Sequence, residues 1–284
     1  MRNFTFKGLF LAVVFMVLGS LSIQAADDGL ITKQITVKLE KAGTLRDKIG
    51  STKRDKITNL KIIGEINGSD WSVIRYMAGR DYYGSESDGK LAILDLSETK
   101  IVSGGGRYLY DDYYIDYFYT HDNELGSRAF YNCSGLTSLS LPSGITSIGG
   151  NAFSGCSGLT SLSFPSGITS IGGYAFSGCS GLTSIYVYAE KLPNMESDVF
   201  DGCDAKKCTV YVPKGTYDDY WLSEFGYFEN IVEFDPTGIN NVITSNDTKE
   251  LSRYSLNGQR LSAPTKGLNI VKYSDGSVKK VVVQ

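Results

Sequence analysis

Histidine is almost absent from this chain: its 284 residues contain one, His121. Histidine-based triads and zinc sites with several histidines therefore have too few candidates. No phosphate-binding loop with its lysine occurs, and the glycines at residues 104–106 lack the strand and helix context of a dinucleotide site. Acidic pairs such as Asp218 and Asp219 are adjacent in sequence, which gives no sign of the convergent carboxylates that hydrolysis needs. We therefore expect no enzyme, with no catalytic, cofactor-binding or metal residues.

Charge is also missing from the middle of the chain, since residues 129–189 contain no Asp, Glu, Lys or Arg. The whole chain is slightly acidic, with 28 Lys and Arg against 31 Asp and Glu, although residues 249–284 hold seven basic and two acidic residues. Phosphate backbones bind to basic surfaces, so the acidic body argues against a nucleic acid partner. The uncharged middle is expected to show Ser, Thr, Gly and Tyr to solvent.

The apolar run at residues 9–18 has ten residues, about half of what a transmembrane helix needs. Arg2 and Lys7 precede the run, and Ala25 supplies a small residue at a cleavage position. This pattern predicts a signal peptide over residues 1–25, cut after Ala25 or Ala26, and hence an exported protein with no transmembrane segment.

A repeat organises the rest of the chain: residues 129–150 return 23 positions later as residues 152–173, and the pattern starts again at residue 175. Within one unit, Leu139 and Leu141 flank Ser140 as in a short strand with one buried face. Six buried side chains contribute roughly 10–15 kcal/mol at about 2 kcal/mol each, but ordering the backbone costs about 1–2 kcal/mol per residue. One coil cannot fold alone, so the period predicts a solenoid whose coils share a core.

The repeated pattern L-T-S-L-S-L-P-S-G-I-T-S-I-G-x-x-A-F-x-G-C-S-G resembles the BspA-like leucine-rich repeats of bacterial surface proteins. With weaker flanking matches, the resemblance covers roughly residues 31–234. It implies a leucine-rich-repeat solenoid of parallel β strands with short helical or irregular segments and helical caps. Because members of that family are adhesins for host matrix proteins such as fibronectin and fibrinogen, it also implies a non-catalytic surface or secreted protein that binds a protein or glycan outside the cell. A structural or spacer role without a specific ligand is the alternative.

The expected domains follow from this pattern. They are an N-terminal cap (26–87), the solenoid with its C-terminal cap (88–234), a polar linker (235–248) and a C-terminal β module (249–284). The module resembles about half of a sorting domain of the Bacteroidetes secretion system, and a plain β module is equally consistent with its sequence. Since both ends of the solenoid are capped, we expect a monomer.

Each cap is expected to contain a helix. Asp70 is a candidate N-cap for a helix that buries Trp71 and Met77. Thr216 is a candidate N-cap for a second helix, whose aromatic residues are expected to cover the last coil: Tyr217, Tyr220, Trp221 and Phe225.

Four of the five cysteines fall at one position of successive coils: Cys133, Cys156, Cys179 and Cys203. Their side chains should point the same way into the core, where small thiols pack well. This predicts a ladder of reduced thiols, with disulfides between adjacent coils as the alternative.

Two surfaces are candidates for partner binding. The first is a tyrosine-rich stretch, and large rigid Tyr side chains are common in binding loops. Its six tyrosines are Tyr108, Tyr110, Tyr113, Tyr114, Tyr117 and Tyr119. The stretch is either a projecting recognition loop or a divergent coil, since the 45 residues from Leu91 to Leu136 nearly equal two repeats.

The second candidate surface is the outward face of the strands. Its residues are expected to align across the coils as two columns: Ser138, Ser161 and Ser184, then Ser140, Ser163 and Tyr186. A plainly solvated surface is the alternative for these small hydroxyls.

Overall fold

The computed structural model describes residues 29–111, 116–235, 250–255, 260–261, 263–264, 266–273 and 278–283. The predicted signal peptide lies outside the described residues, as does the predicted linker apart from Asp235. No helix in the described ranges is long and apolar enough to cross a membrane.

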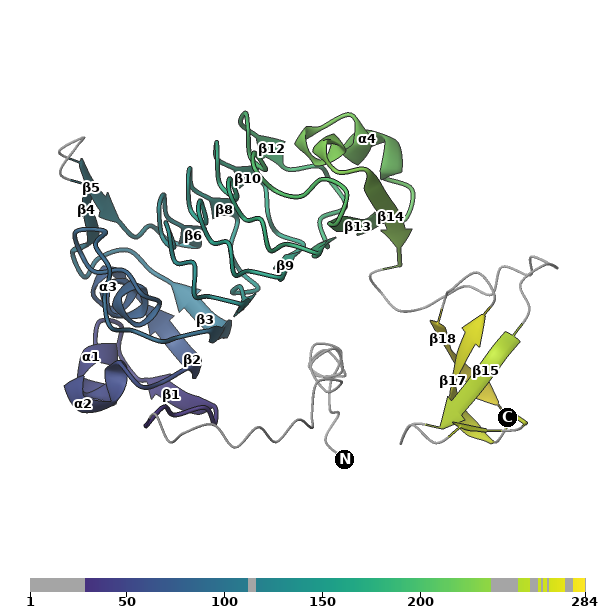
Figure 1. Ribbon diagram of the computed structural model, residues 1–284, viewed down its shortest axis with the longest axis horizontal. Coiled ribbons are helices and arrows are strands. Elements are labelled where there is room, and N and C mark those ends of the chain that lie inside the picture. Colours follow the sequence, from purple (N-terminus) through teal and green to yellow (C-terminus); the bar gives the residue numbers. More distant parts are fainter. Residues whose placement is uncertain are drawn as a thin grey trace.

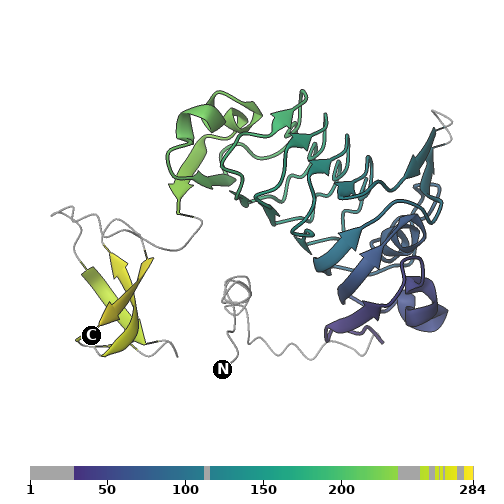
Figure 2. The ribbon, with the colours of Figure 1, turned by 180° about the vertical axis from the view of Figure 1, so that it is seen from behind.

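Parallel strands from successive coils build the main sheet, in the order β1-β2-β3-β7-β9-β11-β13-β14 (Figure 1). Their bounds are β1 Ile35–Leu39, β2 Asn59–Ile66, β3 Ile93–Ile101, β7 Ser138–Ser140, β9 Ser161–Phe164, β11 Ser184–Val187, β13 Thr209–Pro213 and β14 Asn230–Phe234. Four short parallel strands line the opposite side of the coils: β6 Glu124–Leu125, β8 Ser147–Ile148, β10 Ser170–Ile171 and β12 Asn194–Met195 (Figure 2). The predicted leucine-rich-repeat solenoid is confirmed.

The core between the two sheets repeats with the sequence. Along each strand of the repeats, buried and partly exposed residues alternate, as in β9, where Leu162 and Phe164 are buried. Behind the strands, a ladder of nearly parallel phenylalanine rings runs through the stack, with 5.0 Å between the ring centroids of Phe153 and Phe176 and 5.4 Å between those of Phe130 and Phe153. Trp71 covers the first of these rings edge-on at 5.4 Å. The ladder joins the coils into one core, as the energetics of a single coil require.

The described cysteines are all free and buried. The thiol of Cys156 donates to the carbonyl of Phe130 at 3.0 Å, and that of Cys179 donates to the carbonyl of Phe153 at 3.2 Å. Burial raises the pKa of the Cys133 thiol to about 11 and that of the Cys203 thiol to about 12. All five thiols thus fill the core, and those of Cys156, Cys179 and Cys203 also donate to a backbone carbonyl of the preceding coil.

Three helices cover the N-terminal coils: α1 Leu45–Ile49, α2 Ser51–Arg54 and α3 Gly68–Met77. Trp71 and Met77 of α3 are buried, as predicted. The expected cap was wrong by three residues, because Asn67 is the N-cap of α3 and Asp70 stands at the third helical position and completes a capping box. The buried Asp70 carboxylate also accepts the backbone N–H of Leu45 at 2.9 Å, which ties α1 to α3. The main sheet runs without a break from these coils into the repeats, and the boundary at residue 87 stays a prediction.

Side chains from this N-terminal region donate hydrogen bonds to the backbone carbonyls of the first turn in the stack of repeats. In the later coils, turn carbonyls accept backbone N–H groups from the preceding coil. At the first of these turns, around Ala129, no described residue supplies such a backbone donor. The carbonyl of Ala129 accepts Trp71 Nε1 at 3.3 Å and Arg75 Nη1 at 2.9 Å instead. The carbonyl of Ser127 accepts the Tyr108 hydroxyl at 2.6 Å. One tyrosine of the predicted recognition stretch is therefore part of the N-terminal cap.

The tyrosine-rich stretch forms an antiparallel hairpin of β4 Arg107–Asp111 and β5 Asp116–Tyr119, which projects beside α3 (Figure 1). The main-sheet strands before and after it are direct neighbours, with Leu94 opposite Leu139. Of the two alternatives, the divergent coil of nearly two repeats is therefore wrong: these 45 residues make one coil that carries an inserted hairpin.

The C-terminal cap consists of α4 Tyr217–Trp221 and a 3-10 helix, η2 Glu224–Tyr227. Tyr220 and Phe225 are buried against the last coil, as expected. Tyr217 and Trp221 are not: they stack on each other at the surface with 39% and 45% exposure, because a short helix presents one face to the core. Thr216 is the N-cap but makes no side-chain cap, and Glu233 of β14 accepts the N–H of Tyr217 instead.

The C-terminal module forms an antiparallel sheet in the order β16-β15-β17-β18. Its strands are β15 Glu250–Ser255, β16 Arg260–Leu261, β17 Gly267–Tyr273 and β18 Val278–Val283. Buried Arg253 donates to the side chain of Asn269 at 3.2 Å. The structure thus contains the β module that the sequence predicts, and its sorting role stays a prediction.

Candidate functional site

The outward face of the main sheet, called the strand face below, carries the two predicted columns. The register pairs Ser138 with Ser161 and Ser161 with Ser184, and in the second column it pairs Ser163 with Tyr186. All these side chains are partly exposed. The Ser184 hydroxyl donates to that of Ser161 at 3.0 Å. The register therefore aligns the first column across three coils and the second column from Ser163 to Tyr186, while Ser140 lies opposite Asp95 of β3.

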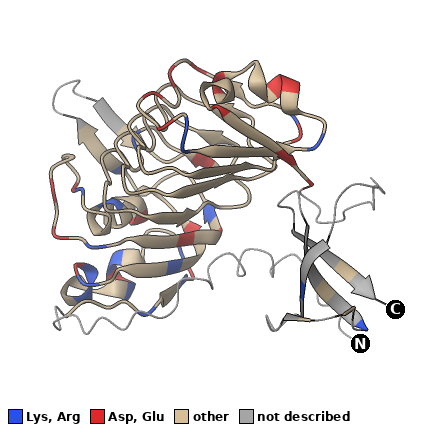
Figure 3. Ribbon diagram, turned by 45° about the vertical axis from the view of Figure 1, so that its right-hand side comes forward, with Lys and Arg blue, Asp and Glu red and all other residues tan. Residues whose placement is uncertain are grey.

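The charge carried by the strand face varies along the solenoid. At its N-terminal end, Lys61 forms ion pairs with Asp95 at 3.2 Å and Glu98 at 2.6 Å. The hydrogen bond with Glu98 raises the pKa of Lys61. The middle coils are free of charge, and Figure 3 shows them tan between the blue and red of the two ends.

At the C-terminal end of the strand face, four partly exposed rings form a cluster: Tyr186, Tyr188, Tyr211 and Phe234. The rings of Tyr186 and Tyr211 stack with their centroids 4.5 Å apart and their planes 6° from parallel. Phe234 stands edge-on to Tyr186 at 6.2 Å. Burial, followed by the neighbouring Tyr211 and Tyr188, raises the pKa of Tyr186, so its hydroxyl stays neutral.

The structure separates the hairpin tyrosines instead of gathering them on one surface. Tyr108 is buried, Tyr110 is partly exposed and Tyr119 is 46% exposed. Tyr113 and Tyr114 lie outside the described residues, and the Tyr117 side chain is not described either. The hairpin is therefore a mixed element, partly cap and partly surface.

Several surface aromatics lie outside the residues that the sequence singles out. Tyr83 is 62% exposed and lies edge-on to Tyr110 at 6.2 Å, next to the hairpin. Tyr211 could have been found from the alternation of Val210, Tyr211 and Val212, which places Tyr211 on the outward face. Phe234 gave no such signal, because its position depends on the last strand joining the sheet.

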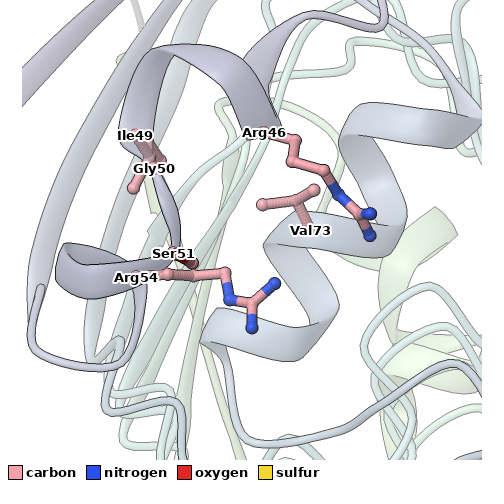
Figure 4. A pocket seen from close by; sticks show the side chains of 6 residues that line it. All are labelled: Arg46, Ile49, Gly50, Ser51, Arg54 and Val73. Carbon is pink, nitrogen blue, oxygen red and sulfur yellow. The ribbon is translucent and has the colours of Figure 1, made fainter.

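One small pocket lies away from these surfaces, at the N-terminal helices. A pocket between α1, α2 and α3 has a volume of about 130 Å³ and is lined by Arg46, Ile49, Gly50, Ser51, Arg54 and Val73 (Figure 4). Ligand pockets for small molecules are typically about 300–1,000 Å³. Arg54 already lies over the ring of Tyr76 at 3.8 Å. No cluster of three potential metal ligands occurs among the described residues.

The chain was compared with curated proteins, solved structures and family models. Curated proteins give no match. A similar solved structure is a leucine-rich repeat protein from Bacteroides ovatus ATCC 8483, with 22% identity and a TM-score of 0.38 over 63% of this chain and 43% of that one. The chain thus spans less than half the length of that protein. Residues 115–220 match, in six copies, the family model described as BspA type leucine rich repeat region, so this part of the solenoid carries BspA-type repeats.

Proposed function

We propose that the chain is an exported, non-catalytic binding protein that holds a protein or glycan partner outside the cell on its strand face. The main support is the alignment of uncharged serine hydroxyls over three coils, which ends at the cluster of Tyr186, Tyr188, Tyr211 and Phe234. Extended faces of this kind are the usual binding surfaces of repeat proteins.

The composition of the strand face also favours recognition. Tyr gives a large rigid contact area at low entropic cost, while Ser provides adaptable hydrogen bonds, and binding loops combine the two for this reason. The rings here are held by one another, as in the stacked pair of Tyr186 and Tyr211, so little side-chain freedom is lost when a partner binds.

The proposal also includes export of the chain and a first partner to test. The basic start and apolar run of residues 1–25 support secretion, and the β module at residues 249–284 is a candidate sorting element. A host matrix protein such as fibronectin or fibrinogen is the first partner to test, because of the resemblance of the repeats to those of adhesins.

The test is binding of the full chain to immobilised matrix proteins and to a glycan panel at physiological salt. Ser163→Arg places a long charged side chain in the middle of the strand face, and the matched control Ser157→Arg places one at an exposed turn of the same coil. We expect saturable binding that Ser163→Arg weakens at least about tenfold, or about 1.4 kcal/mol, and that the control leaves within about twofold.

Absence of saturable binding to every member of both sets would contradict the proposal and favour the spacer role. Binding that both variants leave unchanged would reject the strand face as the binding surface and direct attention to the hairpin around Tyr119.

A further inference from the structure

One face of the Tyr186 ring is covered by a stacked neighbour, and the side chain remains partly exposed. Its register partner on β13 is Tyr211, and the two rings are 6° from parallel with centroids 4.5 Å apart. This separation is close to the spacing of about 4.8 Å between neighbouring strands. The rings therefore stack along the direction that crosses the strands, and the second face of Tyr186 looks toward β9.

On β9, the register partner of Tyr186 is Ser163. A serine side chain is too short to reach the level of the tyrosine ring, so the ladder of stacked rings stops at Tyr186 with room beside it for one more ring. The ring of Phe234 packs nearly perpendicular to that of Tyr186, with the centroids 6.2 Å apart, and to that of Tyr188, with the centroids 5.4 Å apart. The step between the ring and the serine is thus a preformed ledge, bounded by Tyr186 and floored by Ser163.

The floor of this ledge offers hydrogen bonds that the protein does not use. Among the described residues, the hydroxyls of Ser163 and Ser140 have no hydrogen-bond partner. A hydroxyl can both donate and accept. The nearest charged residue of the second column is Asp95, the register partner of Ser140 on β3, and its carboxylate is already paired with Lys61 at 3.2 Å.

We propose that the open face of Tyr186 binds one neutral pyranose ring of a glycan, with the sugar hydroxyls hydrogen-bonded to Ser163 and Ser140. This inference rests on the proposed binding function of the strand face and names the ligand class of one subsite in it.

The chemistry of the ledge selects a sugar over other rings. A pyranose has an apolar C–H face that can lie on an aromatic ring and a rim of hydroxyls that can meet the serines. A proline or phenylalanine side chain could lie on Tyr186 equally well, but it would cover the two serine hydroxyls without bonding to them, and polar groups left unpaired in this way weaken binding. A charged sugar would find no counter-ion on the middle coils, since residues 129–189 have no charge.

The experiment measures binding of methyl β-D-glucopyranoside, methyl β-D-galactopyranoside and methyl β-D-glucopyranosiduronate, which keeps the ring and adds a carboxylate, to the full chain. The method is saturation-transfer NMR at concentrations up to about 50 mM, since single-ring ligands bind in the millimolar range. We expect one of the two neutral glycosides to saturate and the glucopyranosiduronate not to bind. Tyr186→Ser should weaken that glycoside at least about tenfold, and Tyr186→Phe, which keeps the ring, should stay within about threefold. The control is Tyr217→Ser, which removes an exposed tyrosine from α4 and should change nothing.

Three results would overturn the inference: no saturation by either glycoside, an equal loss with Tyr217→Ser, or full binding by Tyr186→Ser. A proline-rich peptide that binds in a Tyr186-dependent way while both glycosides fail would also reject the sugar and assign the ledge to a protein partner. In each of these cases the strand-face proposal can still hold, because it is judged separately by Ser163→Arg against Ser157→Arg on the macromolecular ligand.

Discussion

Gly135 and Gly158 occupy the same position in consecutive coils, both within the sequence Cys-Ser-Gly-Leu-Thr-Ser. A Cβ added at Gly158 would lie 2.3 Å from the carbonyl oxygen of Ser134 in the preceding coil, whereas a Cβ at Gly135 would meet nothing within 4 Å. Neither glycine has a left-handed backbone. The same Gly→Ala substitution therefore tests the coil stacking with local sequence held constant.

The two substitutions should change the free energy of unfolding in opposite directions. Gly158→Ala must push two coils apart, and forced overpacking costs about 1–3 kcal/mol. Gly135→Ala has room, and a compatible Gly→Ala substitution stabilises by about 0.4–1 kcal/mol through the unfolded chain. The gap of roughly 1.5–4 kcal/mol corresponds to a difference in melting temperature of roughly 3–15 °C for a domain of this size.

Thermal unfolding followed by circular dichroism, with the urea midpoint as a second measure, gives this gap directly. Gly181→Ala is a replicate of the clashing case, because its Cβ would lie 2.3 Å from the Ser157 carbonyl oxygen. Equal melting temperatures for Gly135→Ala and Gly158→Ala would refute the stacking geometry.

Three further predictions concern the core and the caps. Tyr108→Phe leaves the Ser127 carbonyl without its hydroxyl donor and should lower the free energy of unfolding by about 1–3 kcal/mol, while Tyr119→Phe at the exposed strand of the hairpin should stay within about 0.5 kcal/mol; equal effects in urea unfolding would reject the capping role of Tyr108. Phe153→Ala removes a ring between two others and should cost about 3–5 kcal/mol, measured in the same way, and a cost below 1 kcal/mol would contradict the ring ladder. Burial raises the pKa of the Cys133 thiol to about 11 and that of the Cys208 thiol to about 12. Unfolded thiols titrate near pH 8.5, so this stability is fully present below that pH and should decline as the pH rises toward 11. At pH 8, thiol reagents should label the native chain slowly and find five thiols after denaturation; fewer than five would show disulfides.

The repeat was predictable because its physics is local. The 23-residue period fixes which leucines, phenylalanines and cysteines recur, and therefore which side chains share the core and which serines align on the strand face. The N-cap of α3 was also within reach of the sequence, because Asn67 and Asp70 have the spacing of a capping box. The bond from Leu45 to Asp70, 25 residues away, has no local pattern.

The structure of the tyrosine-rich stretch, in contrast, could not be predicted from its local sequence. Its length suggested two coils, since nothing in the sequence tells an inserted hairpin from a divergent repeat, and only the pairing of Leu94 with Leu139 settles it. Tyr108 faces inward because the open carbonyl of Ser127 needs a donor, and that need arises only where the stack of coils begins. The ring cluster at the other end likewise depends on where the stack stops, because Phe234 belongs to the last strand of the sheet.

The measurement that tests the binding proposal most directly compares its two candidate surfaces on one ligand. Affinity for the ligand found with the full chain should fall at least about tenfold in Ser163→Arg and stay within about twofold in Tyr119→Ser, which alters the exposed tyrosine of the hairpin. The opposite result, with loss of binding in Tyr119→Ser and full binding in Ser163→Arg, would contradict the account and place the function on the hairpin.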